Sequence, residues 1–163
     1  MTLRRLLGIE LPVVQAPMAG VQGSALAIAV SNAGGLGSLP CAMLSADSMA
    51  AELAALRAGT SKPFNVNFFC HAAPTPDERR EAAWRAQLGP YYDEFGIDAA
   101  AIPAGPGRAA FGVEAADAID AFRPAVVSFH FGLPSAGLLA RVKSWGAKVL
   151  SSAIARWKPA IAV

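Results

Sequence analysis

Three places in this sequence carry residues that could do chemistry, and each belongs to a short run typical of a β-strand. The segment Pro17–Gly20 follows the apolar run Val13–Ala16, Asn67 lies within the alternating run Phe64–Phe69, and His130 closes a later apolar run. Small residues let a main chain approach a planar ligand closely, and a buried amide needs polar partners. An imidazole can donate a hydrogen bond to an anion. Together they predict a ligand site built at strand ends.

Each of these residues also has a purely structural interpretation, which the sequence leaves open. Ala19 can simply pack a strand against a helix, Met18 can fill core space, and Asn67 can bond to neighbouring backbone. A histidine such as His130 can be structural as well. His71 is expected in a loop that borders the same face.

Composition narrows the class of protein. Of the 163 residues, 54% are hydrophobic and 16% charged, which suits buried parallel strands covered by small-residue helices. A net charge of +2 with scattered basic residues argues against nucleic-acid binding. Cys41 and Cys70 form no CxxC pair and are interpreted as buried thiols. No apolar run approaches the ~20 residues that span a bilayer, and no secretory leader is recognisable, so we expect a cytoplasmic location.

Strand-like runs alternate with helical segments, which predicts a parallel α/β architecture. We expect five strands, at Val13–Ala16, Leu36–Leu39, Phe64–Phe69, Ala125–Phe129 and Ala147–Ser151. Helices are expected at Ser24–Asn32, from Ser45 or Asp47 to Arg57, at Asp77–Leu88 with a second piece at Tyr91–Phe95, at Glu114–Phe122 and at Ser135–Trp145. The stretch Ala99–Phe111 is expected to be a loop.

Taken in order, these segments resemble the nitronate monooxygenase family, flavin enzymes once called 2-nitropropane dioxygenases. The resemblance covers roughly residues 8–153 and rests on Gln15–Gly20, Ser31–Gly37, Phe64–Phe68, Val126–Gly132 and Lys148–Ser152. It implies an incomplete (β/α)₈ TIM barrel of about five βα units, because a full barrel needs about 250 residues. Residues 1–153 would form this part of the flavin-binding barrel, and 154–163 a divergent C-terminal tail.

The resemblance implies FMN as the cofactor and the oxidation of alkyl nitronates with O₂ as the activity. The implied catalytic residue is His130, facing the substrate cavity. The implied cofactor-binding residues are Ala16, Pro17, Met18, Ala19, Asn67 and Ser151. A phosphate-binding glycine motif and the family's Ala-Gly-Gly-His segment, which resembles its catalytic base, have no counterpart before the sequence diverges after Ala153. The expected partners are the small-molecule substrate and O₂, with neither nucleic acid nor membrane.

Other interpretations stay open. FMN-dependent enoyl reductases and NADH:quinone reductases share much of the pattern. The chain could also be a non-catalytic truncated fragment that self-associates through an open sheet edge. A third possibility is a small-molecule-binding domain with another α/β fold. A dinucleotide-binding loop is excluded, because Gly34–Gly37 precede a strand, whereas that motif needs glycines after one.

Overall fold

The computed structural model describes residues 2–72, 75, 77–102 and 109–152. The chain forms two compact units, one made of Met1–His71 with Arg108–Val163 and the other of Ala72–Gly107. The predicted tail at 154–163 and part of the expected loop at 99–111 lie outside the described residues. Among the described helices, none combines the length and the apolar character needed to cross a bilayer.

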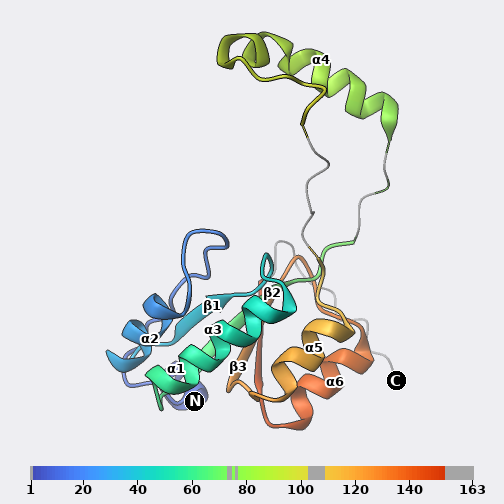
Figure 1. Cartoon of the computed structure of the whole chain (residues 1–163). Helices are drawn as coiled ribbons and strands as arrows, with labels where there is room; N and C mark the ends of the chain where they lie inside the picture. Colours follow the sequence, from blue (N-terminus) through green and yellow to red (C-terminus); the bar gives the residue numbers. More distant parts are fainter. Residues whose placement is uncertain (1, 73–74, 76, 103–108, 153–163) are drawn as a thin grey trace. The chain divides into compact units, whose positions relative to one another are not determined.

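A parallel sheet lies at the centre of the larger unit, with its strands in the order β1-β2-β3-β4 (Figure 1). The strands are β1 Gly37–Pro40, β2 Phe64–Phe69, β3 Val126–His130 and β4 Lys148–Ser151. All neighbours pair in parallel, so their carboxyl ends meet at one edge of the sheet. The predicted parallel α/β architecture is confirmed, and these four strands lie within one residue of their predicted bounds.

The predicted first strand, Val13–Ala16, is wrong as a strand, because only one parallel bridge forms, between Val14 and Leu36. Two backbone hydrogen bonds flank it, from Gln15 N–H to the Leu36 carbonyl and from Leu36 N–H to the Val13 carbonyl, each 2.9 Å. The run therefore lies beside β1 in the position of a strand without extending the ladder.

Side-chain chemistry explains why this ladder stops. The next backbone donor along it would belong to residue 17, which is a proline and has no N–H. The side chain of Gln15 takes over the pairing instead: Ser38 N–H donates to Gln15 Oε1 at 3.0 Å, and Gln15 Nε2 donates to the Ser38 carbonyl at 3.2 Å. An amide side chain thus replaces the backbone at the point where the predicted strand ends.

Helices connect the strands and follow the predictions closely. They are α2 Ser24–Asn32, α3 Ala46–Gly59, α5 Val113–Asp120 and α6 Ala136–Ser144. Ser45, one of the two predicted caps of α3, is the N-cap, because its Oγ accepts from Ser48 N–H at 3.2 Å. Gly146, with φ at 85°, follows α6 as the expected stop signal.

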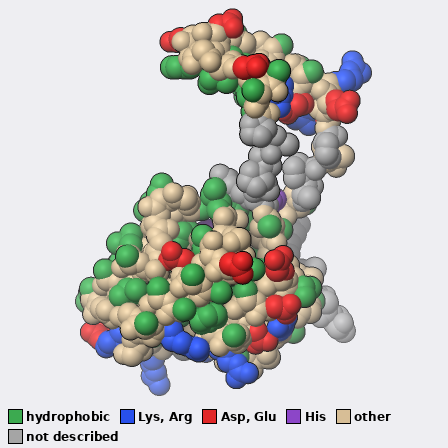
Figure 2. Space-filling view, in the orientation of Figure 1, with side chains coloured by type: hydrophobic (Ala, Val, Ile, Leu, Met, Phe, Trp, Pro, Cys, Tyr) green, Lys and Arg blue, Asp and Glu red, His purple; other side chains and the backbone are tan. Residues whose placement is uncertain are grey.

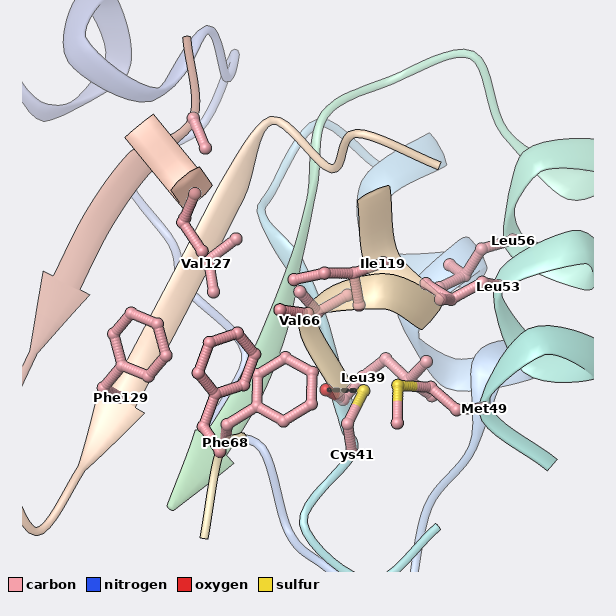
Figure 3. Close-up of a cluster of buried hydrophobic side chains, with 14 of the residues drawn as sticks. Leu39, Cys41, Met49, Leu53, Leu56, Val66, Phe68, Ile119, Val127 and Phe129 are labelled. Atoms are coloured by element: carbon pink, nitrogen blue, oxygen red, sulfur yellow. Dashed lines mark hydrogen bonds between the residues drawn. The ribbon is translucent and has the colours of Figure 1, made fainter. Parts of the chain in front are cut away.

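Helices α3, α5 and α6 cover one face of the sheet (Figure 1) and bury the main hydrophobic core. Figure 3 shows side chains of the strands meeting those of the helices in this layer. The buried residues include Leu39, Val66, Phe68, Val127 and Phe129 from the strands, and Met49, Leu53, Leu56, Ile119 and Val142 from the helices. The Phe111 ring fills the carboxyl end, 4.7 Å from that of Phe68 and 5.2 Å from that of Phe129 between centroids.

The other face of the sheet is closed at its amino end by a helix that the sequence analysis did not predict, α1 Leu3–Leu7. Leu7 and Ile9 pack there against Leu36 and Val126 in a second, smaller apolar cluster. Five residues are too few for a hydrophobic period to be recognised. The apolar residues of this face thus lie at the amino ends of the strands, and polar residues follow them.

The smaller unit contains α4, Glu78–Phe95. Asp77 caps it as predicted, its Oδ1 accepting from the N–H groups of Arg79 and Arg80 at 3.1 and 3.0 Å. The predicted break before Tyr91 is wrong, because the helix runs through Pro90. The fixed φ of proline is itself helical, but inside a helix proline removes one N–H donor and its ring crowds the carbonyl four residues earlier, so Pro90 weakens α4 without ending it. No described residue of α4 is buried.

On the surface in view, charged side chains are mixed with apolar ones. Figure 2 shows hydrophobic side chains over much of the visible face of the larger unit, with acidic side chains among them and basic side chains mainly along the lower edge. The described charges include small local pairs such as Glu10 with Lys62, 2.6 Å apart, and Arg141 with Asp120, 2.8 Å apart. Surface pairs of this kind contribute little to stability.

Candidate functional site

Polar side chains gather on the sheet face opposite α3, α5 and α6. The register pairs Ser38 with Asn65, Asn67 with Ser128, and Phe69 with His130. Since alternate residues of a strand point to the same face, Ser38, Asn65, Asn67 and Ser128 share it with His130. Asn65 and Asn67 are each only 1% exposed. We call these five residues the polar face.

The hydroxyl of Ser128 joins the two asparagines. Its Oγ lies 2.9 Å from both Asn65 Nδ2 and Asn67 Nδ2, which donate to it. Asn65 Nδ2 also donates to Ser38 Oγ at 3.1 Å, and Asn67 Nδ2 to the Ser128 carbonyl at 3.2 Å. The amide donors of Asn67 therefore have protein partners, as its structural interpretation required.

The amide oxygens of the same two residues are less well satisfied. Asn65 Oδ1 is buried and accepts no hydrogen bond from any described residue. The described residues likewise supply no donor to Asn67 Oδ1. A buried acceptor left without a donor costs about 1–3 kcal/mol. The polar face thus holds acceptors that suit a bound water or the N–H or O–H groups of a ligand.

The segment 16–19 runs past the carboxyl end of β1. Ala16 and Met18 are exposed, and Pro17 and Ala19 are half-buried. Gln22 Nε2 holds the segment by donating to the Ala16 carbonyl at 2.9 Å. Within the described residues, the N–H groups of Met18 and Ala19 donate to no protein acceptor. The segment offers free backbone donors to a ligand at this edge.

His130 ends β3 at the same edge and is half-buried. Its Nδ1 lies 2.8 Å from Ser152 Oγ, and its ring centroid lies 6.4 Å from that of Phe69 and 6.3 Å from that of Phe131. The described residues provide no hydrogen-bond partner for Nε2. Phe131 adopts a φ of 65°, a left-handed conformation that a bulky residue rarely takes. Such strain is often found beside functional groups.

Ser151 does not share the face of Asn67 and His130. The register pairs it with Phe129, so the side chains of both belong to the face that the helices cover. The hydroxyl that reaches His130 comes from the next residue, Ser152, which the sequence analysis did not single out. Only the backbone of Ser151 is available to the edge that carries Asn67 and His130.

A separate cavity of about 440 Å³ lies on the helix-covered side, at the beginnings of α3 and α5. Cys41, Met49, Phe68 and Phe111 line it. Burial raises the pKa of Cys41 to about 12, so its thiol stays protonated at neutral pH and is a poor nucleophile. The interpretation of Cys41 as a buried thiol is confirmed, whereas Cys70 is only half-buried. The described residues contain no cluster suited to a metal ion.

The sequence analysis missed most of the hydrogen-bonded supports of this site. Gln15, Gln22, Ser38, Asn65 and Ser128 were not selected. A signal was present for some of them, because Asn65 alternates with apolar residues as Asn67 does, and Ser128 interrupts an apolar strand. Polar residues that alternate with apolar ones in a buried strand therefore indicate a site as strongly as the strand-end residues do.

Comparison with known proteins shows the family to which the sequence is similar. The family profile described as nitronate monooxygenase matches residues 1–160. A nitronate monooxygenase of Paraburkholderia phytofirmans is 43% identical over an alignment of 156 residues, which covers 91% of this chain and 41% of the relative. One of Pseudomonas aeruginosa is 41% identical, with 90% of this chain and 42% of the relative covered. The chain spans about two fifths of the length of these curated relatives.

Solved structures agree. A nitroalkane oxidase from Streptomyces ansochromogenes superimposes with a TM-score of 0.76 at 35% sequence identity, covering 93% of this chain and 42% of that one. FabK from Thermotoga maritima gives a TM-score of 0.62 at 25% identity, covering 91% and 36%. The described sheet and its helices thus correspond to part of a larger α/β barrel, as the sequence predicted.

Proposed function

Because the chain belongs to the nitronate monooxygenase family, we propose that the carboxyl edge of its sheet binds FMN and takes part in the oxidation of alkyl nitronates with O₂. One observation carries the proposal: free backbone donors at Met18 and Ala19 and the unpartnered Nε2 of His130 lie at the strand ends that also carry Asn67. Parallel α/β proteins bind their ligands at this edge.

The residues present fit a flavin ring. A flavin carries carbonyl and ring-nitrogen acceptors as well as one ring N–H donor. The N–H groups of Met18 and Ala19 suit the acceptors, and Asn67 Oδ1 suits the donor. The buried, unpartnered Asn65 Oδ1 offers a second acceptor on the same face. Ala16 and Pro17 would contribute the small surface against which a planar ring can lie. Ser151 could contribute only backbone, because its side chain belongs to the other face.

In this proposal FMN supplies the redox chemistry, accepting electrons from the nitronate and passing them to O₂. The protein positions the substrate and hydrogen-bonds its negative charge. An alkyl nitronate is an anion, and an N–H at Nε2 of His130 can hydrogen-bond one of its oxygens. The rings of Phe69 and Phe131 flank the imidazole, and a hydrogen bond to a charged oxygen is stronger than one between neutral groups.

A second function uses the same edge. An FMN-dependent enoyl reductase or NADH:quinone reductase would need the same flavin contacts but a neutral substrate and a nicotinamide donor. The nitronate monooxygenase profile, which covers nearly the whole chain, favours the first function.

We further propose a cytoplasmic location, since a reducing compartment suits the free thiols of Cys41 and Cys70. Self-association through an open sheet edge stays a prediction, which sedimentation can test.

The test combines cofactor binding with turnover. Purified protein is incubated with FMN, freed of excess, and examined for a bound flavin spectrum and for O₂ uptake with propyl-2-nitronate. We expect both, and a 10- to 100-fold loss of kcat/KM in His130→Gln, since a hydrogen bond to a charged group contributes about 1.5–3 kcal/mol. His71→Gln, the matched control, should retain activity. Protein that binds no FMN refutes the proposal, and flavoprotein reduced by NADH but inert to the nitronate favours the second function.

A further inference from the structure

We propose that Ser152 is a positioning residue for His130: its hydroxyl donates to Nδ1, fixes the imidazole ring and leaves an N–H at Nε2 for an anionic ligand. The ligand that Nε2 meets rests on the proposed function. The orientation of the ring rests on the structure of this chain alone, and it is tested separately.

The backbone places Ser152 beside His130. Ser152 directly follows β4, and its N–H donates to the Phe129 carbonyl at 3.3 Å, the residue before His130 in β3. The Oγ of Ser152 then lies 2.8 Å from His130 Nδ1. The backbone that carries the hydroxyl is therefore fixed by a hydrogen bond to the adjacent strand β3, which restricts its position more than a free loop would.

Two aromatic rings limit the remaining freedom of the imidazole. Phe69 stands beside His130 in the register, and Phe131 is turned back by its left-handed backbone. The rings of Phe69 and Phe131 themselves meet edge to face, with centroids 5.0 Å apart. Together with Ser152 they leave Nε2 as the ring nitrogen without a partner among the described residues.

The proposed direction of the hydrogen bond between Ser152 Oγ and Nδ1 decides what Nε2 presents. One ring nitrogen carries the proton and the other is an acceptor. A hydroxyl that donates to Nδ1 requires Nδ1 to be unprotonated, so the proton resides on Nε2. The site then offers a donor to an oxyanion such as a nitronate or a carboxylate. The opposite tautomer would face that anion with a lone pair, which repels it.

The tautomer can be measured directly by NMR, without FMN or substrate. The sequence contains two histidines, so ¹⁵N-histidine labelling gives two ring systems, and His71→Gln assigns them. At a pH where the rings are neutral, we expect His130 to be mainly the Nε2–H tautomer. In Ser152→Ala the ratio should fall about fivefold, which corresponds to about 1 kcal/mol. Ser152→Thr, which keeps the hydroxyl, should retain the wild-type ratio.

Ser151→Ala is the matched control, because the register places Ser151 on the opposite face. It should leave the ratio unchanged. A wild-type His130 that is mainly Nδ1–H or an even mixture refutes the inference by itself, as does a ratio that Ser152→Ala does not move. Protein that shows the expected tautomer but binds no FMN refutes the proposed function and leaves the role of Ser152 standing.

Discussion

Replacing Gly37 by alanine should destabilise the larger unit strongly, because its backbone leaves no room for a methyl group. A Cβ at this position would collide with the carbonyl group of Ala27 and lie 2.6 Å from Ser31 Oγ. Neither the Ala27 carbonyl nor the Ser31 hydroxyl is free to move away. The Ala27 carbonyl belongs to α2, and Ser31 Oγ accepts from Gly37 N–H at 3.1 Å while donating to the Pro63 carbonyl at 3.0 Å.

The expected cost follows from these contacts. Overpacking a close-packed site costs typically about 1–3 kcal/mol, and a clash with backbone belongs at the upper end. Moving β1 away from α2 also lengthens the hydrogen bond between Gly37 N–H and the buried Ser31 hydroxyl, which contributes about 1 kcal/mol. The sum is about 3–4 kcal/mol, a large share of the 5–15 kcal/mol by which domains are stable.

Urea unfolding followed by circular dichroism measures this cost. Gly137→Ala in α6 is the matched control, because nothing lies within 4 Å of a Cβ there. Alanine in a helix should stabilise that variant by about 0.5–1 kcal/mol. If Gly37→Ala unfolds within about 0.5 kcal/mol of the wild type, the close approach of β1 to α2 is not as described.

Two further predictions concern buried polar groups. The pKa of Cys41 is raised from about 9 to about 12, so the thiol ionises in the unfolded chain first. The contribution of the protonated thiol to stability is complete below pH 9 and falls by about 1.4 kcal/mol per pH unit between pH 9 and 12. Urea unfolding at pH 8 and 10.5 measures this decline, and Cys41→Ala should flatten it. If the variant loses as much stability between the two pH values as the wild type does, the raised pKa of Cys41 is contradicted. Ser128→Ala should cost about 1–3 kcal/mol, because the buried side-chain amides of Asn65 and Asn67 both lose the hydroxyl to which they donate. The exposed Asn32→Ala should cost less, and equal losses would show that the buried network contributes nothing special.

Much of the fold follows from local pattern, and the exceptions have identifiable causes. The run Phe64–Phe69 alternates apolar and polar residues and forms the predicted strand. Val13–Ala16 has the composition of a strand but forms one bridge, because pairing depends on a partner and Pro17 has no N–H to give. Pro90 has the opposite outcome, since the loss of one hydrogen bond does not end an exposed helix.

The site was predictable in position and less so in detail. Parallel strands bring Asn67 and His130 to one edge whatever their distance in sequence. Which serine faces His130 depends on the register of β4, and a shift of one residue moves a side chain to the other face. The sequence analysis named Ser151, on the family resemblance, as a cofactor-binding residue, and it did not single out Ser152, whose hydroxyl contacts His130. The role of the Gln15 amide, which replaces strand pairing, likewise could not be predicted without knowing the partner strand.

The central claim is that FMN lies at the carboxyl edge of the sheet, and mapping backbone and side-chain amide shifts during an FMN titration tests it most directly. We predict the largest changes at Met18, Ala19 and the Asn67 side chain, whose groups face this edge. The cavity beside Cys41 and Gly112 lies on the helix-covered side and serves as an internal control. Changes confined to that cavity, or no saturable change anywhere, would contradict the account.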